Sequence, residues 1–134
     1  MQKFILLLLT FLLTTAQCLA AHQYLEKEYQ NKWCKANNGT TEYILNDKTR
    51  VDCLTEDYAI EFDFANKWAE SVGQSLYYAL CTNKKAGIVL IMENPQKDLK
   101  YLSRLQEVAK KYDIKIWTMA PQDMLQIKPC SNIK

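Results

Sequence analysis

The feature that most constrains this chain is the period-two pattern of Tyr58–Phe64, in which apolar and charged residues alternate from Ile60 onward. Successive side chains of a β-strand point to opposite faces of the sheet. Ile60 and Phe62 therefore share one face, and Glu61 and Asp63 share the other. The pattern predicts a strand that packs a hydrophobic core on one side only and gathers carboxylates on the other.

The preceding segment extends this carboxylate face. Arg50–Leu54 is a short β-rich run, and residues 55–57 have the composition of a turn, which predicts a hairpin with the next strand. If the apolar faces pair, Asp52 lies on the same surface as Glu61 and Asp63. Three clustered carboxylates repel one another unless a cation or a shared proton compensates. The alternative is the ordinary charged face of a half-exposed sheet.

A helix predicted over residues 67–81 follows the hairpin and carries two stripes at helical spacing. The apolar stripe contains Trp68, Val72, Leu76 and Leu80. The polar stripe contains Lys67, Ser71, Gln74 and Tyr78. If the helix covers the charged face of the hairpin, the carboxylates line an acidic pocket. The two stripes lie on nearly opposite sides of the helix, so this arrangement is expected to need Ala69, Gly73 and Tyr77 to face the sheet in part.

These motifs, in this order on strand, strand and helix, resemble the PD-(D/E)XK nuclease superfamily. They are Asp52, then Glu61-Phe62-Asp63, then Gln74 and Tyr78 in the spacing Gln-x-x-x-Tyr, which is similar to the element of the RecB-like branch. The run from Trp33 to about Met92 resembles small exported bacterial members. The resemblance implies an α/β fold with a restriction-endonuclease-like core.

The resemblance also implies a metal-dependent nuclease that hydrolyses phosphodiester bonds of DNA or RNA. Asp52 and Glu61 would be ligands of Mg²⁺ or Mn²⁺, together with the main-chain carbonyl of Phe62. Asp63 would bind a second ion or relay a proton. Superfamily members often add a glutamate from the first helix, and the resemblance does not choose between Glu26 and Glu28.

The chain departs from the superfamily at one position. The lysine that usually follows the glutamate by two residues is replaced by Asp63. Lys67 on the neighbouring helix is the natural substitute, and Gln74 and Tyr78 would position the substrate or the water shell of the metal. The alternative function is a catalytically inactive binding or interaction protein on a nuclease fold.

The first twenty residues have the pattern of a secretory signal peptide. Lys3 provides a basic start, Phe4–Leu13 is an apolar run too short to span a bilayer, and cleavage is expected after Ala20. Residues 21–134 would then form a single domain in the periplasm or outside the cell. Removing Lys3 from the 17 basic residues leaves 16 against 15 acidic ones, a balance that neither requires nor excludes a nucleic acid partner.

The segment after the signal peptide contains four cysteines, an even number that predicts two disulfide bonds in an exported domain. Cys53 points away from the carboxylate face, where the end of the first helix would bring Cys34. Cys81 ends the central helix, and Cys130 lies in the C-terminal tail. We therefore expect Cys34–Cys53 and Cys81–Cys130.

The remaining patterns predict a first helix over residues 22–37 and a strand over residues 41–45. After the central helix come a strand over residues 86–92, a helix to Tyr112 and a strand over residues 114–119, with Pro121 ending the regular structure. The order α-β-β-β-α-β-α-β predicts a central mixed sheet flanked by helices.

Overall fold

A five-stranded mixed sheet with strand order β1-β2-β3-β4-β5 forms the centre of the computed structural model, which describes residues 22–125. The first three strands pair antiparallel, and β3, β4 and β5 pair parallel. The elements, in chain order, are α2 (Glu26–Ala36), β1 (Thr40–Ile44), β2 (Arg50–Leu54), β3 (Tyr58–Phe64), a 3-10 turn (Ala65–Lys67), α3 (Trp68–Thr82), β4 (Lys85–Ile91), α4 (Pro95–Tyr112), β5 (Lys115–Met119) and α5 (Pro121–Leu125).

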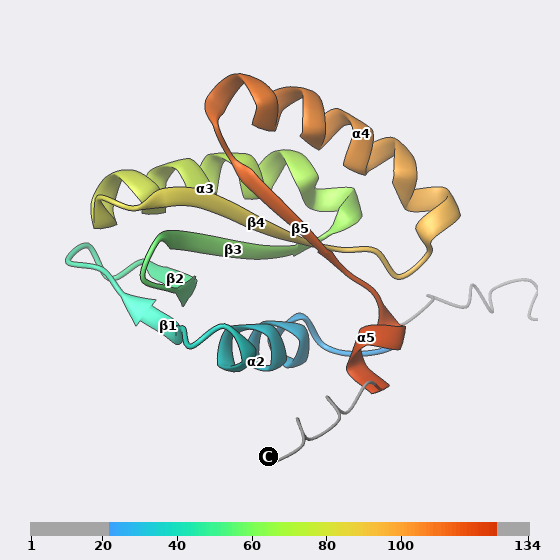
Figure 1. The fold of residues 1–134 in the computed structure, drawn as a ribbon, viewed down its shortest axis with the longest axis horizontal. Helices are drawn as coiled ribbons and strands as arrows, with labels where there is room; N and C mark the ends of the chain where they lie inside the picture. The colour runs from blue at the N-terminus through green and yellow to red at the C-terminus, as the bar shows by residue number, and fades with distance from the viewer. Residues whose placement is uncertain (1–21, 126–134) are drawn as a thin grey trace, which may run out of the picture.

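The predicted α/β class, the order of elements and the mixed sheet flanked by helices are confirmed. Helices α3 and α4 connect parallel strands and cover one face of the sheet, while α2 and α5 lie on the other (Figure 1). Two expectations about element ends are wrong. The first helix begins only at Glu26, and Pro121 begins a short helix because proline suits the first turn, where its missing N–H is not needed.

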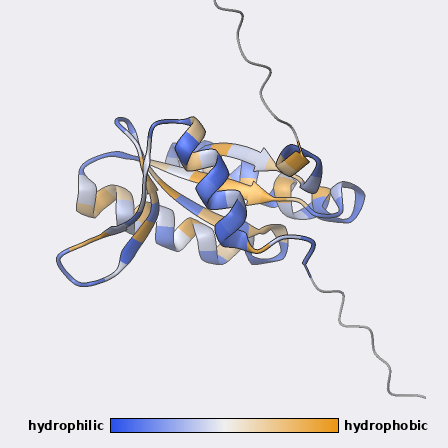
Figure 2. Ribbon diagram, turned by 90° about the horizontal axis from the view of Figure 1, so that it is seen from below, coloured by the Kyte–Doolittle hydropathy of each residue, from blue (hydrophilic) through white to orange (hydrophobic). Residues whose placement is uncertain are grey.

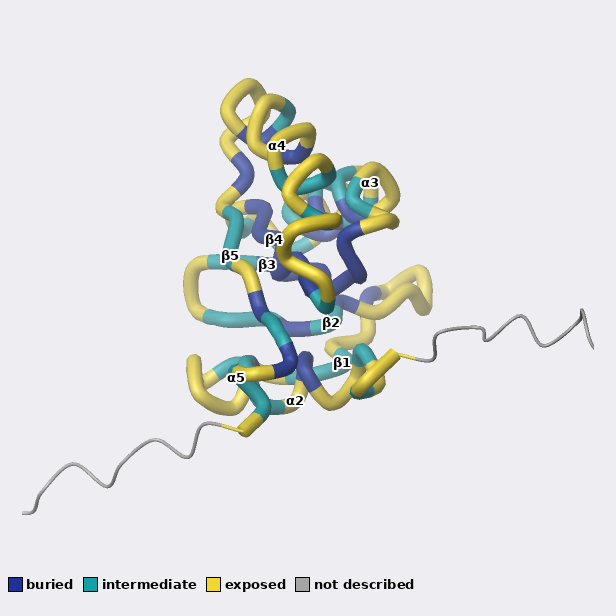
Figure 3. Tube along the Cα trace, turned by 90° about the vertical axis from the view of Figure 1, so that its right-hand side faces the viewer, coloured by how far each residue is buried: buried dark blue, intermediate teal, exposed yellow. Residues whose placement is uncertain are grey.

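The described residues form three hydrophobic clusters, of which the two largest lie on opposite faces of the sheet, and β3 and β4 between them are the most buried strands. The continuous apolar run of β4 is buried on both faces, as parallel strands under helices require (Figures 2 and 3). Ile60 and Phe62 of β3 pack on the α2 side. Ile88 and Leu90 of β4 pack on the side of α3 and α4.

The orientation of α3 differs from the expectation. Its sheet-facing residues are Ser71, Ser75 and Tyr78, all buried, whereas Ala69, Gly73 and Tyr77 are exposed. Two small serines allow the helix to lie directly over the sheet. Three residues of the apolar stripe, Trp68, Val72 and Leu76, pack sideways in the core shared with α4, and the fourth, Leu80, is 79% exposed.

The predicted Cys34–Cys53 disulfide is present and joins the last turn of α2 to β2. Cys81 is exposed and pairs with no cysteine of residues 22–125. Its expected partner, Cys130, lies outside the described residues, as does the predicted signal peptide. None of the helices within residues 22–125 is long and apolar enough to cross a membrane.

Gly39 is required by the disulfide. A Cβ at this position would lie 2.5 Å from Cys53 Sγ and 2.6 Å from Cys34 Sγ, distances that real Cβ atoms do not reach. The bridged sulfurs cannot move aside independently, because each is fixed through its partner to a different element. Gly73, in contrast, lies on the exposed side of α3, where an added Cβ would meet nothing within 4 Å.

We therefore expect Gly39→Ala to destabilise the oxidised protein by about 1–3 kcal/mol through overpacking. The matched change Gly73→Ala should stabilise it by about 0.5–1 kcal/mol, since alanine loses less backbone entropy in a helix. Urea unfolding of both variants measures the difference. Equal effects of the two changes would contradict the packing of Gly39 against the disulfide.

Candidate functional site

Asp52 lies where β2 separates from β3. The two strands pair only at Cys53–Ile60 and Leu54–Ala59. One residue further, the Phe62 N–H donates to the Asp52 carboxylate (N to Oδ2, 2.8 Å) instead of to a main-chain carbonyl. The Asp52 side chain therefore takes the place of a ladder hydrogen bond, which fixes its carboxylate at the opening between the strands.

Glu61 and Asp63 lie on the face of β3 that α3 covers, with 5% and 3% of their surface exposed. The serines of α3 that face the sheet do not neutralise them. Ser71 donates its hydroxyl hydrogen to Trp68 O and Ser75 donates to Val72 O, both within the helix. Glu61 Oε2 and Asp63 Oδ1 are buried without a hydrogen-bond partner, a costly condition for carboxylate oxygens.

The electrostatics of the cluster follow from this burial. Desolvation, together with the neighbouring Asp52 and Asp63 charges, raises the pKa of Glu61 to about 10, and desolvation is the largest of these causes. Burial also raises the pKa of Asp52 to about 6, although the Phe62 N–H opposes the shift. The Asp52 and Glu61 carboxyl groups are within hydrogen-bonding reach of each other. At neutral pH this pair therefore retains a proton unless a cation replaces it.

Lys67 is the cation that the structure brings to this cluster. Its Nζ lies 3.6 Å from Asp63 Oδ1, on a residue four positions earlier at the end of β3, and its side chain is 51% exposed. Burial raises the pKa of Asp63 to about 6, and the ammonium group holds it below the value that burial alone would give. In return, the Asp63 charge raises the pKa of Lys67, so this lysine stays protonated.

The first helix contributes one glutamate to the cluster, a choice that the sequence leaves open. The half-buried Glu26 is close enough for the cluster to act on it: burial raises its pKa, and the Asp52 carboxylate acts in the same direction. Glu28 instead accepts the Leu25 N–H at the start of α2 (2.7 Å). Glu70, one turn after Lys67, is a further carboxylate that acts on Glu61 and Asp63, and no sequence motif indicated it.

Gln74 and Tyr78 lie together beside the carboxylates. Tyr78 is buried in a core cluster with Val51 and Ala59, and burial raises its pKa. The half-buried Gln74, one helical turn earlier, opposes this rise in the pKa of Tyr78, whereas the charges of Glu61 and Asp52 add to it. Tyr78 is therefore a core aromatic whose polar end belongs to the site.

The donor set fits a hard divalent cation in its chemistry. Carboxylate oxygens are the ligands that Mg²⁺ and Mn²⁺ prefer, and two of them are buried here without accepting a hydrogen bond. The main-chain groups of alternate residues of a strand point to the same side. Tyr58 O and Phe62 N both point toward β2, so the Phe62 carbonyl also points toward β2, into the opening beside Asp52. Within residues 22–125, no group of three or more His, Cys, Asp or Glu side chains has the geometry needed to hold a metal ion.

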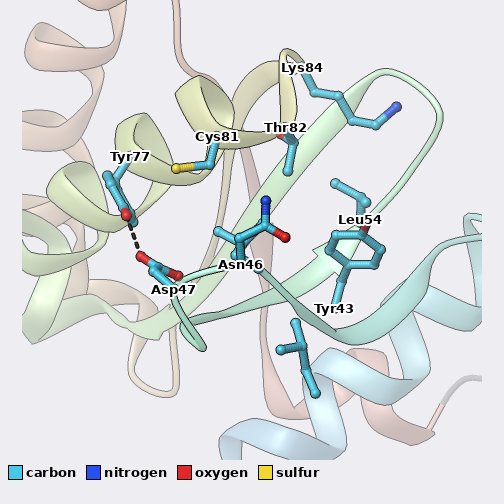
Figure 4. Close-up of a pocket in the computed structure, with 10 residues that line it drawn as sticks. Tyr43, Asn46, Asp47, Leu54, Tyr77, Cys81, Thr82 and Lys84 are labelled. Carbon is cyan, nitrogen blue, oxygen red and sulfur yellow. Dashed lines mark hydrogen bonds between the residues drawn. The ribbon is translucent and has the colours of Figure 1, made fainter.

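A cavity of about 460 Å³ lies elsewhere, between the β1–β2 turn and the end of α3 (Figure 4). Asp47 accepts a hydrogen bond there from Tyr77, and Cys81 and Thr82 line the same space. None of the carboxylates of the cluster lines this cavity. The candidate site is therefore the opening between β2 and β3, which is defined by its charges and not by the volume of a pocket.

Comparison with known proteins finds no match: no family model, curated protein or solved structure is significantly similar to this chain.

The raised pKa values predict how stability depends on pH when no metal is present. A carboxyl group with a higher pKa in the folded state binds more protons there than in the unfolded chain. Its stabilising effect is complete below the ordinary value, 4.5 for Glu61, and is lost as the pH rises toward about 10. With a chelator present, Glu61→Gln should therefore raise the melting temperature, and its advantage over the parent should increase from pH 5 to pH 9.

Glu107→Gln provides the matched control, because Glu107 is exposed on α4. This variant should melt close to the parent at every pH. A Glu61→Gln advantage that stayed constant over the same range would show that Glu61 does not titrate with a raised pKa.

Proposed function

We propose that this chain is a metal-dependent phosphodiesterase that hydrolyses nucleic acid, with the restriction-endonuclease-like arrangement that the motifs resemble. The observation that supports this most is the set formed by the half-buried Asp52 and the buried Glu61 and Asp63 at the opening between β2 and β3, with two buried carboxylate oxygens that accept no hydrogen bond. A scaffold protein would gain stability by replacing them with apolar residues. Retaining three such groups in one place is typical of a functional site.

Asp52, Glu61 and the Phe62 carbonyl are the groups that would hold Mg²⁺ or Mn²⁺, and Asp63 would contribute to the same site or an adjoining one. A bound ion of this kind polarises a phosphate oxygen and lowers the pKa of a coordinated water. The protein supplies rigid placement: Asp52 is fixed by the Phe62 N–H, and Glu61 is fixed on a strand covered by α3.

The remaining residues have roles that follow from their positions. Lys67 is protonated and half exposed beside Asp63. Its ammonium group can therefore contact the phosphate of a substrate that approaches from solvent while it remains paired with Asp63. Its position substitutes for the lysine that the superfamily has two residues after the glutamate. Gln74 and Tyr78 present an amide and a hydroxyl at the edge of the site, where they would orient substrate.

A second function is favoured by one specific observation. Asp63 stands where a nuclease of this superfamily usually has its lysine, and it is almost fully buried. Such a chain would bind nucleic acid or another partner on a nuclease fold without cleaving it. Metal-dependent cleavage separates the two functions.

The direct test incubates the oxidised protein with plasmid, single-stranded DNA and RNA, in Mg²⁺, in Mn²⁺ and in chelator. We expect cleavage of at least one substrate only when metal is present. Metal and nucleic acid binding without cleavage would favour the second function. If neither binding nor cleavage occurs, both are wrong.

For the metal itself, we expect Mn²⁺ to raise the melting temperature of the parent by mass action on the folded state. The rise should be larger at pH 8 than at pH 6, because carboxyl groups with raised pKa values must release their protons before they bind. Asp52→Asn should abolish it, while Asp98→Asn on α4 should leave it intact. A parent melting temperature that does not respond to Mn²⁺ would refute the metal site.

For the chemistry, Lys67→Ala should reduce the cleavage rate about 100-fold or more, the scale seen when a group that stabilises transition-state charge is removed. The fold should survive, because the Lys67 side chain is half exposed. Lys110→Ala on the outer side of α4 is the control. Unchanged cleavage by Lys67→Ala would assign the catalytic cation to another residue.

A further inference from the structure

The main chain of Asp52 is held by side chains and not by the regular ladder of the sheet. Strands β1 and β2 pair on both sides of this residue, through Thr41–Cys53 and Tyr43–Val51, but not at Glu42 and Asp52 themselves. On the β3 side the Asp52 carboxylate replaces a ladder bond to Phe62. Asp52 therefore lies in a gap of the hydrogen-bond ladder on both edges of its strand.

Gln30 of α2 fills the gap on the β1 side. Its side chain is buried, with 3% of the residue exposed. Its amide nitrogen donates to the Asp52 main-chain carbonyl (2.5 Å) and to Glu42 Oε1 (3.0 Å). Both N–H groups of one amide are thus used, one to hold Asp52 and one to orient Gln30 itself.

Glu42 has an unusual backbone conformation at this place. Its φ of 55° lies in the left-handed region, which is sparsely populated by residues other than glycine, asparagine and aspartate. The conformation removes Glu42 from the ladder, and its carboxylate accepts hydrogen bonds from Gln30 and from Arg50, whose Nη1 is 3.2 Å away. The strained backbone of Glu42 and the buried amide of Gln30 therefore both lie next to Asp52.

The placement of Gln30 on α2 connects it to the rest of the site. Glu26, Gln30 and Cys34 are spaced by four residues and therefore lie on one face of the helix. Glu26 acts on the carboxylate cluster, Gln30 bonds to Asp52, and Cys34 bonds to the neighbouring Cys53. One helical face thus meets β2 at two consecutive residues and continues to the cluster.

We propose that Gln30, oriented by Glu42, is a positioning residue for Asp52. Its hydrogen bond fixes the position of the Asp52 main chain. From this position one oxygen of the Asp52 carboxylate accepts the Phe62 N–H, and the carboxylate lies beside Glu61. The consequence for metal binding and catalysis rests on the proposed function, whereas the positioning of the carboxylate does not.

The test replaces Gln30 by methionine, which keeps the approximate volume and removes both donors. The readout is native-state hydrogen exchange of the Phe62 amide, with Ile60 on the same strand as internal reference. We expect Gln30→Met to reduce protection of Phe62 at least about tenfold more than protection of Ile60, because only Phe62 depends on the Asp52 carboxylate. Equal loss of protection at both amides would mean a merely structural role and would overturn the proposal.

Thr55→Val is the matched control, because it removes side-chain hydrogen bonds from the same hairpin at its other end. Thr55 Oγ1 donates to Tyr58 O and accepts from Tyr58 N. This variant should not reduce Phe62 protection selectively. If Gln30→Met fails to fold, Glu42→Ala replaces it. This variant removes the acceptor that orients Gln30, and it should shift Phe62 in the same direction by a smaller factor.

Mn²⁺ titrations of the same proteins separate this proposal from the proposed function. When the parent binds Mn²⁺, Gln30→Met should weaken the affinity at least about tenfold, and Thr55→Val should not. Selective exposure of Phe62 in a protein that does not bind Mn²⁺ would support the positioning role and refute the metal site. An unchanged Phe62 amide in Gln30→Met would refute the positioning role, whatever the metal does.

Discussion

The burial of carboxylates on β3 is the constraint on which the rest of this structure depends. Glu61 and Asp63 alternate with the core residues Ile60 and Phe62, so a strand that buries one set must orient the other toward α3. Covering that face removes water from two acidic groups and leaves an oxygen of each without a hydrogen bond. The negative charge is compensated by a retained proton, by the Lys67 ammonium group and, in our proposal, by a divalent cation.

Helices α2 and α3 hold the carboxylates in this unfavourable arrangement. Ser71 and Ser75 satisfy their own hydroxyls within α3, so the helix lies close to the sheet without adding donors to the site. The face of α2 that carries Gln30 and Cys34 is tied to β2 by a disulfide and by a buried amide. A site whose charges repel requires such rigid support, because relaxation would otherwise separate the carboxylates.

Much of the fold could be predicted because its signals are local. The bounds of β2 and β3 follow from period-two alternation and from the turn between them, and the buried strand β4 follows from its apolar run. The pairing of Cys34 with Cys53 followed from which face of β2 the sulfur occupies. The rotation of α3 was wrong, because an apolar stripe does not say which neighbour it packs on. Trp68 turned toward α4, and small serines faced the sheet.

The sequence by itself determined that Asp52, Glu61 and Asp63 occupy one face of a hairpin, since side-chain direction in a strand is fixed by residue parity. It also determined that Lys67 follows Asp63 by only four residues, at the point where β3 leads into α3. Only the tertiary structure decided that this face is buried, that Glu26 and not Glu28 reaches it, and that Gln30 holds the Asp52 main chain. These contacts join elements that are distant along the chain, and the packing of α2 and α3 on opposite faces of the sheet creates them.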